Sequence, residues 1–198
     1  MRVIAGEKRG KILVGISGDK IRPTTDKIKG AIFSSIQADL RNAKVFVDLF
    51  GGSGAMGIEA LSRGVEMAYF FDSSRESIEI IKKNVALTGY ESRVKIIQTT
   101  AIKGIEMFHQ NKAVCDIIFM DPPYIQGDSF GELLEMISEK EILSENGKVV
   151  IESEKSVIMP LEKNNLVCYK TKKYGNSKIS YFCREKNEFK NSSLSGEF

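Results

Sequence analysis

Histidine and cysteine are scarce in this chain of 198 residues. The only histidine is His109, which excludes a histidine-based catalytic triad and a metal site with several histidine ligands. The three cysteines, Cys115, Cys168 and Cys183, lie far apart, and no pair has the close spacing of a zinc or redox site. We therefore expect no bound metal, and we interpret the cysteines as structural.

Long apolar runs are also missing. The longest, such as residues 45–50 and 117–120, have the length of strands, whereas a helix that spans a bilayer needs roughly 20 apolar residues. The apolar part of the first six residues is too short for a signal peptide. Hydrophobic residues make up 42% of the chain, enough for an ordinary core. The sequence thus predicts a soluble, cytoplasmic and monomeric protein with one main domain.

Charge of one sign is not in excess overall, but it is unevenly distributed. The net charge is +3 for the whole chain, +5 for residues 1–29, −7 for residues 30–162 and +6 for residues 163–190. Basic faces bind polyanions such as RNA by releasing condensed counterions. Lysines that only keep the protein soluble would give the same pattern, so charge alone leaves both interpretations open.

The pattern of apolar residues and turns divides the chain into three parts. Residues 1–22 form an N-terminal extension, in which two short runs, 2–5 and 11–14, predict a β-hairpin with Lys8 and Arg9 at its tip. Residues 23–185 form the main domain. Residues 186–198 are polar and are predicted to be a disordered tail.

The main domain alternates strands with helices. A first helix is predicted over residues 26–40, with Ile28, Ile32, Ile36 and Leu40 on one face. Strands are then predicted at residues 45–50, 67–71, 94–98, 116–120 and 148–152, with helices between them, and two final strands at 166–173 and 178–184. This pattern indicates an α/β fold of the Rossmann-like type: a mostly parallel sheet covered by helices on both faces, with an antiparallel edge.

Three polar or glycine-rich segments follow three of these strands: residues 48–54, Asp72, and residues 121–124. In open parallel sheets, ligands bind beyond the carboxyl ends of the strands. Their common position at that edge is stronger evidence for a site than any one of the segments.

The first segment, Asp48-Leu49-Phe50-Gly51-Gly52-Ser53-Gly54, lies between a strand and a helix. Its glycines permit a tight turn and a close approach of a ligand to the backbone. The start of the following helix offers free N–H groups to a carboxylate or phosphate. A purely structural turn is the alternative, because a glycine-rich loop alone is weak evidence.

Asp72 is placed to accept hydrogen bonds from both hydroxyl groups of a ribose. It follows the glycine loop at nearly the spacing typical of such an acid. Capping of the next helix, which begins near Ser73, is the alternative. The loop and the acid would suit NAD as well as S-adenosylmethionine, but the loop matches the dinucleotide fingerprint poorly.

The third segment, Asp121-Pro122-Pro123-Tyr124, carries the chemistry. The prolines remove two N–H donors and leave carbonyl acceptors, Asp121 adds a further acceptor, and Tyr124 offers a stacking surface. Such a group can grip both protons of a planar amine and direct its nitrogen at a methyl donor. We interpret all four residues as catalytic and expect S-adenosylmethionine as the cofactor.

These motifs resemble those of amino-methyltransferases that act on nucleic acids, and in detail the RsmD-type family of bacterial 16S ribosomal RNA guanine-N2 methyltransferases. The similar segments are residues 2–6 with Arg9-Gly10, 22–26, 47–64, 121–124 and Tyr174-Gly175, in the same order along residues 1–185.

The resemblance implies a class I methyltransferase sheet of seven strands with an N-terminal β-hairpin extension. It implies cofactor contacts from residues 48–54 and 72, with Ser73, Thr100 and Ala101 nearby. It also implies RNA contacts from the extension and the segment after it: Arg2, Lys8, Arg9, Lys11, Arg22, Thr24 and Thr25. Many relatives carry an acid or amide where this chain has Thr100, which leaves its adenine contact open.

The function that follows is methylation of the exocyclic N2 amino group of a guanine in small-subunit ribosomal RNA, with the small ribosomal subunit or an assembly intermediate as the partner. A DNA adenine-N6 methyltransferase would use the same four-residue motif, although 198 residues leave no room for a large DNA-reading domain. A noncatalytic RNA-binding assembly factor that uses the basic ends alone is the other alternative.

Overall fold

The structure is a computed structural model that describes residues 1–16, 26–122 and 129–185. Its helices are α1 (Asp26–Ser35), α2 (Gln37–Leu40), α3 (Ala55–Ser62), α4 (Arg75–Thr88), α5 (Ala101–Gln110) and α6 (Ser129–Glu139), with a 3-10 turn η1 (Glu91–Arg93). Its strands are β1 (Val45–Asp48), β2 (Met67–Asp72), β3 (Val94–Gln98), β4 (Cys115–Met120), β5 (Leu143–Glu154), β6 (Glu162–Lys163), β7 (Leu166–Tyr174) and β8 (Ser177–Arg184).

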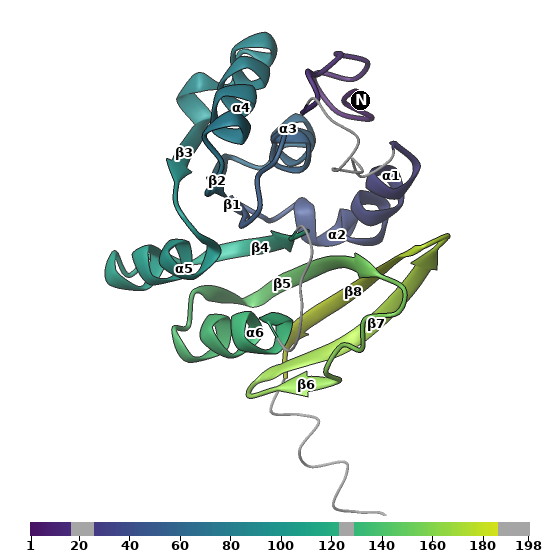
Figure 1. Cartoon of the computed structure of the whole chain (residues 1–198), viewed down its shortest axis with the longest axis vertical. Helices are drawn as coiled ribbons and strands as arrows, with labels where there is room; N and C mark the ends of the chain where they lie inside the picture. The colour runs from purple at the N-terminus through teal and green to yellow at the C-terminus, as the bar shows by residue number, and fades with distance from the viewer. Residues whose placement is uncertain (17–25, 123–128, 186–198) are drawn as a thin grey trace, which may run out of the picture.

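The strands form one sheet in the order β3-β2-β1-β4-β5-β8-β7-β6 (Figure 1). The first five are parallel, and β8, β7 and β6 join them as an antiparallel edge. The predicted architecture is confirmed, but the count of seven strands is one short of the eight described. The additional strand, β6, has two residues, too few for a sequence to display the alternation typical of a strand.

Helices cover both faces of the sheet. On one face, α5 and α6 pack against β2, β4 and β5 through Phe71, Ile105, Leu134 and other buried side chains. On the other face, α1 to α4 bury a second layer that includes Ile32, Phe46 and Phe70. Because the parallel strands are buried on both faces, their sequences are nearly continuous apolar runs. These runs are why the strands could be predicted from the sequence.

The ends of some elements differ from the prediction. The helix predicted over residues 26–40 is broken at Ile36, whose φ of −111° and ψ of 18° leave the helical region, although the predicted apolar face is buried. Strand β1 ends at Asp48, two residues earlier than predicted, because Leu49 and Phe50 already lie in the turn. Strand β5 starts at Leu143, before the turn-like residues 144–147, through a register shift against β4.

The described N-terminal extension, residues 1–16, is here called the N-terminal arm. Its two halves pair as predicted: Val3 N–H donates to Lys11 O at 2.9 Å, and Leu13 N–H donates to Met1 O at 3.1 Å. Only one ladder pair, Arg2 with Ile12, is formed, so the arm is a hairpin-like turn without two full strands.

A buried charge cluster fastens the arm to α3. The fully buried carboxylate of Glu59 accepts hydrogen bonds from the backbone N–H groups of Ile4 (2.7 Å) and Ala5 (3.0 Å) and from Arg63 Nε (2.8 Å). The buried Nζ of Lys29 lies 3.6 Å from Glu59 Oε2 and donates to Arg2 O at 2.5 Å. Each buried charge therefore has partners, as burial requires.

The order of the strands fixes where a ligand can bind. β1 lies between β2 and β4. From β1 the chain first forms β2 and β3 toward one edge of the sheet, and it then crosses back to form β4 and β5 toward the other edge. Such a switch point opens a crevice beyond the carboxyl ends of the strands. None of the described helices combines the length and apolarity that crossing a membrane would need.

Candidate functional site

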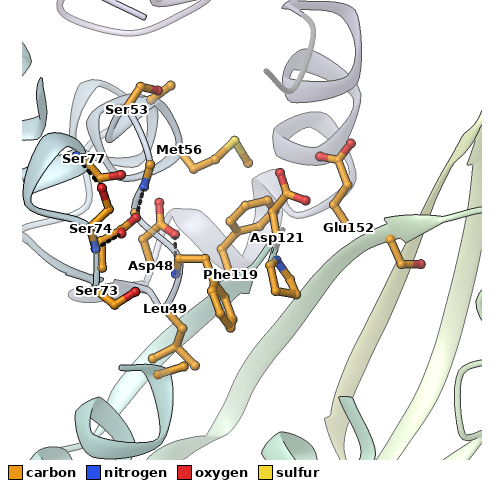
Figure 2. Close-up of a pocket in the computed structure, with 18 of the residues that line it drawn as sticks. Asp48, Leu49, Ser53, Met56, Ser73, Ser74, Ser77, Phe119, Asp121 and Glu152 are labelled. Atoms are coloured by element: carbon orange, nitrogen blue, oxygen red, sulfur yellow. Dashed lines mark hydrogen bonds between the residues drawn. The ribbon is translucent and has the colours of Figure 1, made fainter. Parts of the chain in front are cut away.

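A cavity of about 1360 Å³ lies at this switch point. It is lined by the carboxyl ends of the parallel strands, the starts of α3, α4 and α5, part of α6, and the arm. Single small-molecule sites are commonly about 300–1,000 Å³, so this cavity has room for a cofactor and a second planar group. It brings all three predicted segments together, as Figure 2 shows for Asp48, Ser73 and Asp121.

The glycine loop after β1 is held by its neighbours. Gly51 N–H donates to Phe71 O at 2.8 Å, and Gly52 N–H donates to Asp72 Oδ2 at 2.8 Å. The buried side-chain amide of Asn84, on α4, donates to Ser53 O at 2.8 Å. The loop is thus fixed by β2 and α4 before any ligand arrives, which lowers the ordering cost of binding.

The structural requirement for glycine differs between positions of this loop. A Cβ on Gly51 would lie 2.8 Å from Ile81 Cδ1, so this residue is small because α4 packs against it. Gly52 has a φ of +53°, and a Cβ there would meet no atom closer than 3.8 Å, so it leaves room for a ligand. Gly54 ends the loop as the N-cap of α3 with a φ of +76°, and it is not among the residues that line the cavity.

Asp72 lies at the end of β2 and lines the cavity. Its Oδ1 accepts from Ser74 N–H and its Oδ2 from Gly52 N–H, both at 2.8 Å. A carboxylate has about four acceptor positions, so two remain for ribose hydroxyls. Ser74, and not Asp72, is the N-cap of α4, because its hydroxyl accepts from Ser77 N–H. Ser73 lines the cavity beside it.

Asp48 forms the floor of the cavity and is 1% exposed. The Phe50 N–H donates a long hydrogen bond, 3.3 Å, to Asp48 Oδ1. The pKa of Asp48 is raised from 3.8 to about 7, mainly because burial disfavours the charged form; the hydrogen bond from Phe50 N–H lowers the pKa, and the nearby charge of Asp72 adds to the increase. A cation bound above this floor would favour the ionised form.

The lining of the cavity is acidic. Seven of the described lining residues are acids and one is basic: Asp48, Asp72, Glu76, Asp121, Glu132, Glu152 and Glu154 against Lys155. A diphosphate, as in NAD, would be repelled by this surface, whereas a sulfonium cation with an ammonium group would be attracted. The residues therefore fit S-adenosylmethionine, which the glycine loop alone could not distinguish from a dinucleotide.

Thr100 and Ala101 line the cavity where β3 leads into α5. The Thr100 hydroxyl accepts from Lys103 N–H at 3.4 Å, so this side chain caps α5. Phe50 of the glycine loop also lines the cavity.

Asp121 and Pro122 follow β4 directly and line the same cavity. In the sheet, Asp48 of β1 pairs with Phe119 of β4, so Asp121 lies two residues beyond the cavity floor. Asp121 projects toward the cavity in Figure 2. The other two residues of the motif, Pro123 and Tyr124, lie outside the described part of the chain.

The predicted RNA contacts on the arm are on its surface. Arg9 and Lys11 are exposed, and neither side chain forms an ion pair with another described residue. Arg2 Nε is 3.2 Å from Asp26 Oδ2, and Lys8 Nζ is 2.8 Å from Glu7 Oε1, so these two charges are partly neutralised. The remaining predicted contacts, Arg22, Thr24 and Thr25, lie in a segment that the structure leaves undescribed.

Several residues of the site escaped the sequence analysis. Glu152 and Ser153 at the end of β5, and Asn176 and Ser177 at the β7–β8 turn, line the cavity. So do Glu132 and Met136 of α6. The end of a fifth strand next to the Asp-Pro-Pro-Tyr segment was a usable signal for Glu152, because parallel strands end at one edge of the sheet.

The cysteines and the histidine lie apart from this chemistry. Burial raises the pKa of the Cys115 thiol, which donates to Ile142 O and is inert as a nucleophile. His109 Nδ1 is 3.0 Å from Lys140 O near the end of α5. Within the described ranges, no group of acids, cysteines and histidine could hold a metal ion.

The fold and the site define a class I S-adenosylmethionine-dependent methyltransferase: a switch-point cavity, a glycine loop, an acid after β2 and an acid-proline pair after β4. A family model described as "Conserved hypothetical protein 95" matches residues 1–183. The chain belongs to this family, which is the RsmD-type family of methyltransferases.

Known relatives agree over most of their length. The Bacillus subtilis protein YlbH is 34% identical over 182 residues, which cover 92% of this chain and 98% of the relative. The Escherichia coli protein named "Ribosomal RNA small subunit methyltransferase D" is 27% identical and covers 93% of this chain and 90% of its own. The solved structure of Escherichia coli yhhF superposes with a TM-score of 0.77 at 27% identity, over 94% of this chain and 99% of that one.

Proposed function

We propose that this protein transfers a methyl group from S-adenosylmethionine to the N2 amino group of a guanine in small-subunit ribosomal RNA. Family membership and the Escherichia coli relative named for the small-subunit RNA support the substrate class. The observation that carries the proposal is that Asp121 lines the same cavity as the glycine loop and Asp72. The amine acceptors and the cofactor residues thus share one space.

The chemistry requires an activated amine. The lone pair of a guanine amino group is delocalised into the ring and is a poor nucleophile. S-adenosylmethionine supplies an electrophilic methyl group on a sulfonium. Hydrogen bonds from the amine to the Asp121 carboxylate and the Pro122 carbonyl would draw the nitrogen toward tetrahedral geometry, with its lone pair free for in-line attack.

The methyl transfer itself is a single displacement at the methyl carbon. A carbon–nitrogen bond forms as the carbon–sulfur bond breaks, the sulfur keeps the electron pair, and the amine loses one proton to Asp121 or to water. Tyr124 is proposed to stack on the base, a contact that contributes roughly 1–3 kcal/mol.

The cavity lining is acidic, but the N-terminal arm beside it carries exposed basic residues that suit a large polyanion. The exposed Arg9 and Lys11 on the arm are proposed to bind the RNA backbone, together with the residues of segment 22–25. The substrate would be a small ribosomal subunit or its assembly intermediate in the cytoplasm, bound by a monomeric enzyme.

A deletion strain tests the proposal. Mass mapping of its small-subunit RNA should reveal one guanine that lacks a methyl group, restored by the wild-type gene. The variant Asp121→Ala should fail to restore it, with a loss of kcat of about 10²–10³-fold or more, while S-adenosylmethionine still binds. The matched variant Asp39→Ala removes a partly exposed carboxylate that lies 3.5 Å from Lys148 Nζ and does not line the cavity, and it should restore the methyl group fully.

Two outcomes would replace the proposal with its alternatives. Methyl transfer to duplex DNA, but not to ribosomal RNA or particles, would identify a DNA methyltransferase. Full function of Asp121→Ala in cells would identify an RNA-binding factor without catalysis.

A further inference from the structure

Glu152 is a second carboxylate beside the catalytic motif. Strands β4 and β5 are parallel, and their last ladder pair joins Met120 to Ile151. The next residues, Asp121 and Glu152, are therefore neighbours across the two strands, and neighbouring residues point to the same face of a sheet. Figure 2 shows both side chains directed toward the same side of the cavity.

The environment of Glu152 is that of a functional acid. It is only 7% exposed, yet it lines the cavity, and its partner across β8 is the buried Ile179. Its position at the cavity wall, one strand from Asp121, puts its acceptor oxygens within the space that a base must occupy.

The bases with an amino group differ in what lies next to that group. In guanine, the amino group lies between two ring nitrogens: N1 carries a hydrogen and is a donor, and N3 has a lone pair. In adenine the neighbour of the amino group, N1, has a lone pair, and in cytosine the neighbour, N3, has one as well. An ionised carboxylate only accepts hydrogen bonds, so it would attract the guanine edge and repel the other two.

We propose that Glu152 selects guanine by accepting the N1–H hydrogen bond while Asp121 and the Pro122 carbonyl hold the N2 amino group. This inference rests on the proposed function and deepens it, because it states how the site recognises its base. Glu152 is thus a specificity-determining residue, and the arrangement excludes adenine-N6 and cytosine-N4 amines from the same cavity.

A base analogue tests this directly. 2-Aminopurine keeps the 2-amino group of guanine but has a lone pair at N1. Small subunits are reconstituted with RNA that carries guanine or 2-aminopurine at the target position mapped in the deletion strain. The wild type should use 2-aminopurine with a kcat/KM lower by about 10–100-fold, the discrimination typical of a good base contact.

The variant Glu152→Gln places an amide that can donate to N1. Its kcat/KM should fall with guanine and rise with 2-aminopurine, so that their ratio narrows at least about tenfold, while the Kd for S-adenosylmethionine stays the same. The control Glu145→Gln makes the same change at the exposed, opposite end of β5 and should leave the ratio unchanged.

The outcomes are separable. Equal use of guanine and 2-aminopurine by the wild type would overturn the role of Glu152, even if Glu152→Gln failed to fold. An unchanged ratio in a folded Glu152→Gln would overturn it too. If the wild type transferred no methyl group to the guanine-containing particles, the proposed function itself would fail.

Discussion

Two buried carboxylates, Glu59 and Asp48, lie on either side of the start of α3 and have opposite surroundings. Glu59 is surrounded by donors from the chain itself: two backbone N–H groups, Arg63 and Lys29. Asp48 accepts a long hydrogen bond from Phe50 N–H, at 3.3 Å, and lines a cavity. The difference teaches how a structural acid can be distinguished from a candidate functional one: the structural acid is held by donors of the chain itself, and the candidate functional acid faces the space that a ligand would enter.

Removal of the Glu59 charge should have the largest effect on stability. Glu59→Gln leaves Lys29 buried without its carboxylate, and breaking a buried pair in this way costs about 3–5 kcal/mol. We expect a thermal midpoint lower by about 6 °C or more, since about 1 kcal/mol corresponds to 2–4 °C in a chain of this size. Calorimetry of the variant measures the shift.

The same variant should loosen the arm before the rest of the domain unfolds. Hydrogen exchange at Ile4 and Ala5, whose N–H groups donate to Glu59, should accelerate more than exchange in β4. The control is Glu66→Gln, a change of an exposed glutamate. It should change neither the thermal midpoint nor the hydrogen exchange at Ile4 and Ala5. Unaltered exchange in a folded Glu59→Gln would mean that the cluster does not hold the arm.

Asp48 should make stability depend on pH in the opposite sense to an ordinary paired acid. Because its folded pKa of about 7 lies above its ordinary 3.8, the protonated form is favoured in the folded state. The contribution of Asp48 to stability is complete below pH 4 and is lost as the pH rises to 7, by up to about 4 kcal/mol at about 1.4 kcal/mol per pH unit.

Asp48→Asn should remove this part of the pH dependence. Denaturant unfolding of both proteins, without cofactor, between pH 4 and pH 8 gives the difference curve. In the wild type, S-adenosylmethionine should bind more tightly above pH 7 than at pH 6, because its positive charge favours the ionised carboxylate. A flat difference curve would contradict the role of Asp48 as an unsatisfied acid.

Asn84 joins the N-terminal arm to the glycine loop. The loss of its side chain should have an intermediate effect on stability. Its side chain accepts from Val14 N–H (2.7 Å) and donates to Val14 O (2.9 Å) and Ser53 O (2.8 Å), which links the arm to the glycine loop. Asn84→Ala should cost about 1–3 kcal/mol, and it should weaken S-adenosylmethionine binding because the loop is less ordered. Calorimetric titration and thermal unfolding measure both effects.

Asn111→Ala is the matched control. Asn111 also uses its amide nitrogen for a backbone carbonyl, Met107 O at 2.7 Å, but at an exposed helix end. Its cofactor affinity should equal that of the wild type. If Asn84→Ala also kept full affinity, the arm and the loop would be independent.

The sequence predicted the parts of the site that are local in the chain. A strand followed by a glycine loop, an acid after the next strand and Asp-Pro-Pro-Tyr after the fourth can each be recognised from a few consecutive residues. Their convergence also follows from the sequence, because parallel strands end at one edge of the sheet.

The sequence could not predict pairings between distant residues. Glu59 and Asn84 look like surface residues of amphipathic helices, yet both are buried because the arm covers them. Their partners, Ile4, Ala5 and Val14, lie 54 to 70 residues away in sequence. The break at Ile36 likewise has no signal in the sequence, because the apolar periodicity continues through it from Ile32 to Leu40.

The smallest effect should come from single charges on the arm that Glu59 holds in place. Arg9 is exposed and pairs with no described acid, whereas Lys8 is 2.8 Å from Glu7. Arg9→Ala should therefore weaken binding to small-subunit RNA more than Lys8→Ala does, and it should reduce the slope of log K against log salt by about 1. Binding measured at several salt concentrations tests this, and equal effects of the two variants would mean that Glu7 does not neutralise Lys8 toward RNA.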